Sequence, residues 1–290
     1  MLLRAPAKLN LTLEVLDRLD DGYHRVRSVM APIGLWDELE IEPADGGGGF
    51  LCDPADLGGP SNLAVRALKA AGIDPSALHV RLRKGIPVGA GLGGGSSDAA
   101  AILAAARDGR LPARAPQPWP EIARALGSDV PFFLAGGPAL VEGTGERVTP
   151  AGAAPPWWAV VAMPDATVAT AQAYRLLDAA REGRPRERRS RLESRSIRAL
   201  EALQRRDFAS LLELLENDFQ GPVSRAFPAI AQARLALESA AGRRAVLTGS
   251  GAAVYALFED EAGARSAAER WDPRQGRIHV APFVDDGSWR

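Results

Sequence analysis

The chain has 290 residues, 46% hydrophobic and 24% charged, with a formal net charge of −1. This length and balance fit an ordinary globular protein of roughly two domains and give no sign of a nucleic-acid or membrane partner. The single cysteine, Cys52, excludes an internal disulfide. The N-terminus lacks the apolar core of a signal peptide, and no run approaches the ~18 apolar residues of a membrane span. A cytoplasmic protein is therefore expected.

The first half of the chain alternates short strands and helices. The apolar–polar alternation of KLNLTLEVL (8–16) predicts a strand, which ends in a turn at Asp21-Gly22. The next expected elements are, in order, a strand over 37–43, a helix over 61–72 capped by Ser61, a strand over 78–87, an alanine-rich helix over 97–109, a helix over 119–127, and a turn leading into a strand within 129–143.

The second half begins after a link rich in proline, alanine and glycine (150–156). The elements expected there are a buried strand over 157–164, helices over 170–180, 196–219 and 228–240, two strands joined by a glycine turn within 244–258, a helix over 262–271, and a last strand over 276–283. Strands and helices alternate without a regular βαβ rhythm and without an internal repeat. The sequence therefore predicts an α+β fold in two domains, residues 1–153 and 154–290.

GAGLGGGSSDAA (89–100) carries the clearest chemical signal. No lysine follows its last glycine, which excludes a Walker A loop. A dinucleotide fingerprint fits only if one glycine is moved, and the strand with an acidic end that it requires is missing. Glycines let backbone N–H groups approach one anion, and Ser96, Ser97 and Asp98 begin a helix whose free N–H groups favour negative charge. We interpret the segment as a phosphate-binding loop, and not as a linker, because a strand and a strong helix flank it directly.

Three motifs in order give a resemblance to a known family. PVGAGLGGGSSDAA (87–100) resembles the second motif of the GHMP superfamily, small-molecule kinases named after galactose, homoserine, mevalonate and phosphomevalonate. VLTGSGAAVYALF (246–258) resembles the third motif, and APAKLNLTLEV (5–15) resembles the first. The resemblance implies a two-domain fold with the active site in the cleft between the domains, ATP as co-substrate, and Mg²⁺ bridging its phosphates.

Residues 6–41 and 126–150 are similar to a narrower group of these kinases, whose substrate is an alcohol that carries a cytidine diphosphate group. The similarity extends weakly to 217–230 and lapses across the arginine-rich stretch 181–195. Ser128 stands where this group usually has alanine. The resemblance implies phosphorylation of a tertiary hydroxyl in the non-mevalonate route to isoprenoid precursors.

Phosphoryl transfer needs alignment, charge neutralisation and a group that guides the hydroxyl proton. The resemblance implies that Asp129 accepts this proton and that Lys8 lies near it. Taken alone, Asp129 would be a turn aspartate, and Lys8 would fit an edge-strand lysine and a cleft-facing lysine equally well. Strand alternation puts Asn10 on the same face as Lys8. A cation beside Asp129 would lower the pKa of its carboxyl and make it a positioned, weak base.

The remaining candidate site residues fall into two groups. For ATP these are the loop and helix start, Pro87, Val88, Gly89, Ala90, Gly91, Leu92, Gly93, Gly94, Gly95, Ser96 and Ser97, together with Asn62 and Lys84, which match family positions near the adenine. For the substrate they are Lys8, Asn10, Asp129, Tyr23, His24, Thr170 and Tyr174. The aromatic rings suit stacking on cytosine, with Tyr174 on the opposite face, but Thr170 alone would be a helix cap and Tyr174 a core aromatic. The sequence does not identify metal ligands.

Three other functions stay open from the sequence. Another GHMP kinase would use a different small alcohol, and a catalytically silent nucleotide sensor would keep the fold without the reaction. A nicotinamide dehydrogenase is the third, and it would have to bind NAD. The arginine-rich stretch lacks the interleaved aromatic residues of single-strand nucleic-acid binding, so we expect no nucleic-acid partner. The chain is expected to be a monomer or a homodimer.

Overall fold

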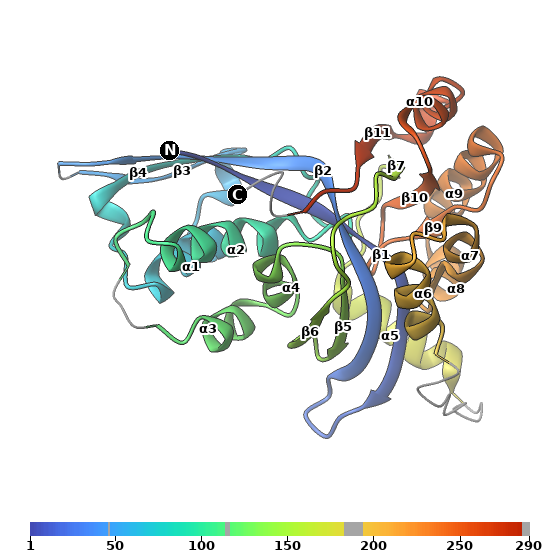
Figure 1. Cartoon of the computed structure of the whole chain (residues 1–290), viewed down its shortest axis with the longest axis horizontal. Coiled ribbons are helices and arrows are strands. Elements are labelled where there is room, and N and C mark those ends of the chain that lie inside the picture. The colour runs from blue at the N-terminus through green and yellow to red at the C-terminus, as the bar shows by residue number, and fades with distance from the viewer. Residues whose placement is uncertain (46, 114–116, 183–193, 286–290) are drawn as a thin grey trace.

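The computed structural model describes residues 1–45, 47–113, 117–182 and 194–285. Two β-sheets and their helices form the molecule (Figure 1), which confirms the predicted α+β class. The arginine-rich stretch 181–195 falls mostly outside the described residues. In the described part of the chain, no helix is both long and apolar enough to cross a membrane.

Two long antiparallel strands, β1 (Leu2–Arg18) and β2 (His24–Pro43), form the centre of the larger sheet. The predicted turn at Asp21-Gly22 joins them, and Gly22 has the positive φ of +88° that favours glycine. Both strands are longer than the sequence pattern predicts. They pair with one another from Leu2–Glu40 to Arg18–His24, so each supplies the hydrogen bonds that extend the other.

The larger sheet has the strand order β3-β4-β2-β1-β8; β5 pairs with the first part of β2, along the same edge as β4, and β6 pairs with β5. The added strands are β3 (Gly49–Asp53), β4 (Leu78–Arg83), β5 (Ala139–Gly143), β6 (Arg147–Pro150) and β8 (Glu216–Asn217). Strand β8 comes from the second half of the chain and pairs in parallel with β1. The larger sheet is therefore not built from the first 153 residues alone.

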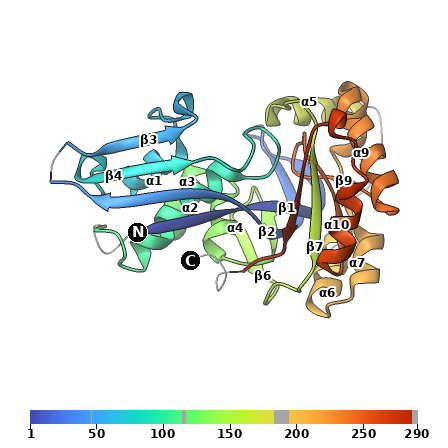
Figure 2. The same ribbon diagram turned by 90° about the horizontal axis from the view of Figure 1, so that it is seen from above.

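Four helices cover one face of this sheet (Figure 2). They are α1 (Leu63–Ala70), α2 (Gly94–Arg107), α3 (Trp119–Leu126) and α4 (Val130–Ala135). Two expectations are corrected here. Asn62, and not Ser61, caps α1, because its side chain accepts a hydrogen bond from the N–H of Ala64. The segment after Asp129 forms a short helix instead of a turn, because Pro131 at an early helical position needs no N–H partner.

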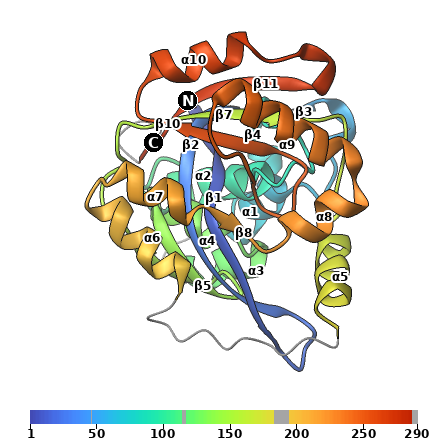
Figure 3. The same cartoon turned by 90° about the vertical axis from the view of Figure 1, so that its right-hand side faces the viewer.

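The smaller sheet has the order β11-β7-β10-β9, all antiparallel. Its strands are β7 (Trp158–Met163), β9 (Val246–Leu247), β10 (Val254–Phe258) and β11 (Arg277–Pro282). The accompanying helices are α5 (Thr170–Arg181), α6 (Arg195–Gln204), α7 (Phe208–Leu214), α8 (Gln220–Ala226), α9 (Pro228–Ala241) and α10 (Glu261–Glu269). Figure 3 shows α9 and α10 on the outer side of this sheet.

Strand alternation gives β7 two buried faces. Val160 and Ala162 pack into the core beneath α9 and α10, whereas Ala159 and Val161 belong to a second core between the two sheets. That second core also holds Leu9 of β1, so both halves of the chain contribute to it. The link expected to separate the domains runs from the end of β6 to β7.

Candidate active site

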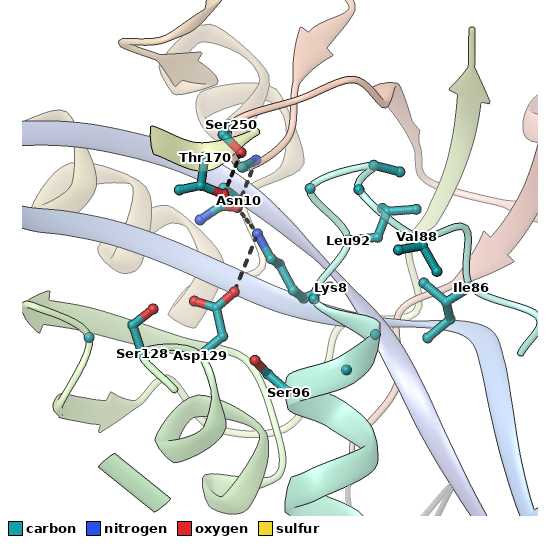
Figure 4. Close-up of a pocket in the computed structure, with 18 of the residues that line it drawn as sticks. Lys8, Asn10, Ile86, Val88, Leu92, Ser96, Ser128, Asp129, Thr170 and Ser250 are labelled. Carbon is teal, nitrogen blue, oxygen red and sulfur yellow. Dashed lines mark hydrogen bonds and ion pairs between the residues drawn. The ribbon is translucent and has the colours of Figure 1, made fainter. Parts of the chain in front are cut away.

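A cavity of 640 Å³ lies where the larger sheet, the glycine-rich loop and the loop between β9 and β10 meet (Figure 4). Nearly all the site residues predicted from sequence line it. These are Lys8, Asn10, Tyr23, His24, Asn62, Lys84, every residue from Pro87 to Ser96, Asp129, Thr170 and Tyr174. The exception is Ser97. The structure thus brings together residues from β1, β2, α2, α5 and the start of α4.

The glycine-rich loop turns sharply between β4 and α2. Gly89, Gly91 and Gly93 all have φ between +70° and +77°, a region that side chains disfavour. A Cβ on Gly91 would lie only 2.4 Å from the carbonyl oxygen of Thr248, so the two glycine loops touch through their backbones. The N–H of Ala253 also donates to the carbonyl oxygen of Ala90 at 3.0 Å. The loop is therefore braced by the second half of the chain.

Helix α2 begins at Gly94, earlier than the sequence indicates, which corrects the expected role of Ser97. The N–H of Ser97 donates to the carbonyl oxygen of Gly93, so it is not one of the free groups at the helix start. Its side chain is fully buried, outside the cavity lining, and its hydroxyl has no hydrogen-bond partner. Ser96 lies in the first turn and lines the cavity, so its hydroxyl remains a candidate phosphate ligand.

Lys8 and Asp129 face each other across the cavity (Figure 4). The Lys8 ammonium lies 3.9 Å from a carboxylate oxygen of Asp129, whose side chain is 33% exposed. Asp129 occupies the N-cap position of α4 but caps no backbone N–H, which leaves its carboxylate free to turn toward the cavity. Burial lowers the pKa of Lys8, and the charge of Asp129 opposes that change.

Asn10 joins Lys8 to the loop between β9 and β10. Its side-chain oxygen accepts hydrogen bonds from the Lys8 ammonium and from the N–H of Gly249, and its side-chain nitrogen donates to Ser28 at 2.8 Å. The residue is 4% exposed. Because the bonding partners of Asn10 are all protein groups, Asn10 holds Lys8 in place. It also lines the cavity, where the sequence predicted that it would bind the substrate.

His24 and Tyr174 line the cavity together, but not as the sequence predicts. Their rings stack on each other with centroids 4.9 Å apart and planes within 18°. A base placed between them would need a centroid separation of ~7 Å, two stacking distances. Tyr23 is 68% exposed and makes no such stack. Burial is the main cause that raises the pKa of Tyr174 to about 12. Thr170 reaches Ser250 of the neighbouring loop at 3.2 Å.

The two residues expected near the adenine are held by protein groups. The Asn62 side chain caps α1 and also donates to the carbonyl oxygen of Leu57. The Lys84 ammonium contacts carboxylate oxygens of Asp37 and Asp98, the latter at 2.6 Å. Both residues line the cavity, yet neither side chain is free to turn into it.

Sequence reasoning missed Asp37, although its pattern holds a signal. Asp37 alternates along β2 with the apolar residues Leu39 and Ile41, and a carboxylate on a core-facing position requires partners. Asp98 was assigned only to a helix start. Burial, reinforced by the carboxylate of Asp37, raises the pKa of Asp98 to about 8, although Lys84 acts in the opposite direction.

Among the described residues, no three His, Cys, Asp or Glu side chains come together to hold a metal ion. Mg²⁺ bound with ATP takes ligands from the phosphates and water and needs only one or two protein oxygens. The Ser96 hydroxyl, on the cavity wall, is suited to that limited role.

Comparison with protein families identifies the class of this cavity. Residues 62–137 match the model of the GHMP kinases N terminal domain, and residues 199–278 match the model of the GHMP kinases C terminal region. The first match includes the glycine-rich loop, and the second includes the loop between β9 and β10. Fold and site together define a GHMP kinase.

Similarity to individual proteins identifies a narrower family within this class. The chain is 41% identical to 4-diphosphocytidyl-2-C-methyl-D-erythritol kinase from Symbiobacterium thermophilum, over 89% of this chain and 91% of that protein. It is 39% identical to the Pelotomaculum thermopropionicum protein of the same name, over 95% of each. A crystal structure of 4-(cytidine 5'-diphospho)-2C-methyl-D-erythritol kinase aligns with a TM-score of 0.78 and 38% identity, covering 98% of this chain and 99% of that one. The chain belongs to the 4-diphosphocytidyl-2-C-methyl-D-erythritol kinase family.

Proposed function

We propose that this chain transfers the γ-phosphoryl group of ATP to the 2-hydroxyl of 4-diphosphocytidyl-2-C-methyl-D-erythritol, releasing ADP, in isoprenoid precursor biosynthesis. The observation that supports the proposal is the cavity itself, whose lining includes the glycine-rich loop and the Lys8–Asp129 pair. Identity of 36–41% to relatives of that name, over most of the chain, supports the choice of substrate.

In the proposed reaction the bond between the γ-phosphorus and the β–γ bridging oxygen breaks, and a bond forms from the γ-phosphorus to the substrate oxygen. Asp129 accepts the hydroxyl proton, and the protonated Lys8 keeps that carboxylate ionised and oriented. The N–H groups at the start of α2 and the Ser96 hydroxyl bind the phosphates. Mg²⁺, when bound with ATP, neutralises the charge that develops on the phosphate oxygens.

The cytidine end of the substrate is proposed to bind beside Tyr23, His24 and Tyr174. The stacked His24 and Tyr174 rings present an aromatic surface at this end of the cavity, and the exposed Tyr23 ring adds a second one at its mouth. Cytosine can stack on such surfaces with no change of the backbone. We also propose a cytoplasmic location, because a chain with a single cysteine needs no oxidising compartment to form internal disulfides.

The test is ADP release with Mg-ATP and four alcohols assayed side by side, the cytidyl substrate, homoserine, mevalonate and galactose. Turnover with the cytidyl substrate alone is the expected result, and the phosphorus NMR spectrum of the product should show the signal of a new phosphomonoester. Turnover with another of the four would contradict the assigned substrate but not the kinase chemistry. ATP binding without any turnover would contradict the reaction and favour a nucleotide sensor.

A further inference from the structure

A buried group of three ionisable residues lies behind the glycine-rich loop. Asp37 comes from β2, Lys84 from the end of β4, and Asp98 from α2, and the side chains are 0%, 8% and 2% exposed. The two carboxylates share the Lys84 ammonium. We call these three residues the loop anchor. The proposed reaction makes no use of them, although Lys84 and Asp98 both line the cavity.

Asp37 binds the chain immediately before the phosphate loop. One carboxylate oxygen accepts hydrogen bonds from the N–H groups of Gly85 and Ile86, both at 2.8 Å. The other oxygen binds Lys84 and lies against Gly94, where an added Cβ would come within 3.0 Å of it. Asp37 therefore contacts the residues that precede the loop and also the first residue of the helix that follows it.

The charge of this carboxylate has a cost at a phosphate site. An anion close to the start of α2 is stabilised by the helix dipole but repels the phosphates that would bind there. Lys84 offsets this repulsion, because its ammonium is held between the two carboxylates. The loop anchor thus fixes both ends of the loop and pairs the charge of Asp37 with that of Lys84 behind the nucleotide.

We propose that Asp37, with Lys84 as its counter-ion, is the positioning residue of the nucleotide site and acts through the backbone of the phosphate loop. The inference rests on the proposed function, because it takes the loop to bind ATP phosphates. Asp37 contacts the loop and not the acceptor alcohol, so its loss changes the affinity for ATP and not that for the alcohol.

The two acidic residues of the loop anchor are expected to respond differently to the same substitution. Asp37→Asn puts an NH₂ group where an oxygen now accepts, either from the Lys84 ammonium or from the two N–H groups, so at least one contact is lost. Asp98 has one oxygen without a hydrogen-bond partner, which an amide NH₂ can replace without losing a bond. Asp98→Asn is therefore the matched control within the same cluster, and Glu38→Gln is the control on the exposed face of β2.

The experiment measures ATP binding by calorimetry, KM for ATP and for the cytidyl substrate, and deuterium exchange over residues 85–94. For Asp37→Asn we expect ATP affinity weaker by about tenfold or more, KM for the alcohol within about twofold, and faster exchange at Gly85 and Ile86. Asp98→Asn and Glu38→Gln should stay within about twofold for ATP. Unchanged ATP affinity in folded Asp37→Asn, or equal weakening of both substrates, would overturn the proposal.

A second pair of variants covers the case in which Asp37→Asn does not fold. Lys84→Met should weaken ATP binding because it leaves the Asp37 carboxylate behind the phosphates without its counter-ion. Lys84→Arg keeps a positive charge beside Asp37 and should retain more of the affinity than Lys84→Met, and equal weakening in both variants would contradict the counter-ion role. If the wild type binds ATP but phosphorylates none of the alcohols, the proposed function fails, while the ATP-binding and exchange results still decide the role of Asp37.

Discussion

Lys8 and Asp129 differ in burial, and the difference matches the roles proposed for them. The Lys8 side chain is 4% exposed and fixed by Asn10, whereas the Asp129 side chain is 33% exposed and caps nothing. A fixed cation can orient a carboxylate, and a partly exposed carboxylate can reach an incoming hydroxyl. These differences could not be obtained from sequence, since they depend on which strand and which helix end meet at the cavity.

Asp129→Asn should keep ATP binding and lower kcat about 10²–10⁴-fold, because the amide preserves the shape of the side chain but accepts no proton. Steady-state kinetics and ATP calorimetry on the same preparation make the comparison. Asp165→Asn, an exposed aspartate outside the cavity lining, is the control and should behave as wild type. Near-normal kcat in Asp129→Asn would remove its assigned role.

The lowered pKa of Lys8 predicts a loss of activity on the alkaline side. Lys8 must be charged to orient Asp129, so kcat should fall as pH rises through an apparent pKa below 10.5. Lys8→Arg, whose guanidinium stays charged, should be less active but should show no such decline. The measurement is kcat from pH 6 to 10 for both proteins, and a decline that persists in Lys8→Arg would assign it to another group.

The raised pKa of Asp98 predicts a pH-dependent difference in stability. In the folded state Asp98 keeps its proton up to about pH 8, whereas in the unfolded chain it loses the proton near 3.8. The folded state therefore binds more protons between these values, so this group makes the free energy of unfolding decrease as pH rises from about 4 to 8.

Asp98→Asn removes that dependence, so its Tm relative to wild type should rise from pH 5 to pH 8 and then level off. A difference of 1 kcal/mol corresponds to ~2–4 °C for a chain of this size. Thermal unfolding followed by circular dichroism at several pH values gives the result. A Tm difference that stays constant with pH would contradict the assigned protonation.

At the scale of elements, sequence patterns located the longer helices and most strands, but they missed α4, α8, β3, β6 and β8 and the element boundaries at the site. Helix α2 starts at Gly94 because Gly93 before it adopts a left-handed conformation. The N–H of Ser97 therefore lies inside the hydrogen-bonded part of the helix and not among the free N–H groups at its start. Strands β1 and β2 were predicted as short segments because their full length depends on mutual pairing. Backbone contacts between loops distant in sequence, such as Gly91 with Thr248, have no signature in a single segment.

Gly91→Ala tests the contact between the two glycine loops. Its φ of +77° is strained for alanine, and the new Cβ would lie 2.4 Å from the carbonyl oxygen of Thr248, so one loop must move. We expect a free energy of unfolding lower by about 2 kcal/mol or more, with weaker ATP binding. Urea unfolding checks this. Gly59→Ala, where a Cβ meets no atom within 4 Å, should leave the stability within about 0.5 kcal/mol.

For the whole molecule, the informative feature is the core between the two sheets. Tyr255 of β10 is fully buried there and donates a hydrogen bond to the carbonyl oxygen of Asn10 on β1 at 2.8 Å. The sequence predicted two halves joined at 150–156, but the shared core could not be inferred from local patterns. Sheet β1–β2 and sheet β7–β10 contribute side chains to it in alternation along each strand.

Tyr255→Phe should lower the free energy of unfolding by about 1 kcal/mol, because it removes one buried hydrogen bond and leaves the carbonyl of Asn10 without that donor. Deuterium exchange should rise on β1 and on β10 together, since the bond joins them. Exchange that increases on β10 alone would show that the two sheets open independently.

The strand β8 and the shared core have a consequence for how this chain can be cut or recombined. Glu216 and Asn217, which lie in the second half of the chain, form the edge strand of the sheet that holds Lys8. The side-chain amide of Asn217 also donates to the carbonyl oxygens of Leu247 and Gly249. A fragment that ends at the proline-rich link would lack this edge and expose the apolar face meant for the other sheet. Neither half is therefore expected to fold when it is expressed alone. A chimera that takes one half from a relative should also need the residues of the other half that pack against it in the core between the sheets.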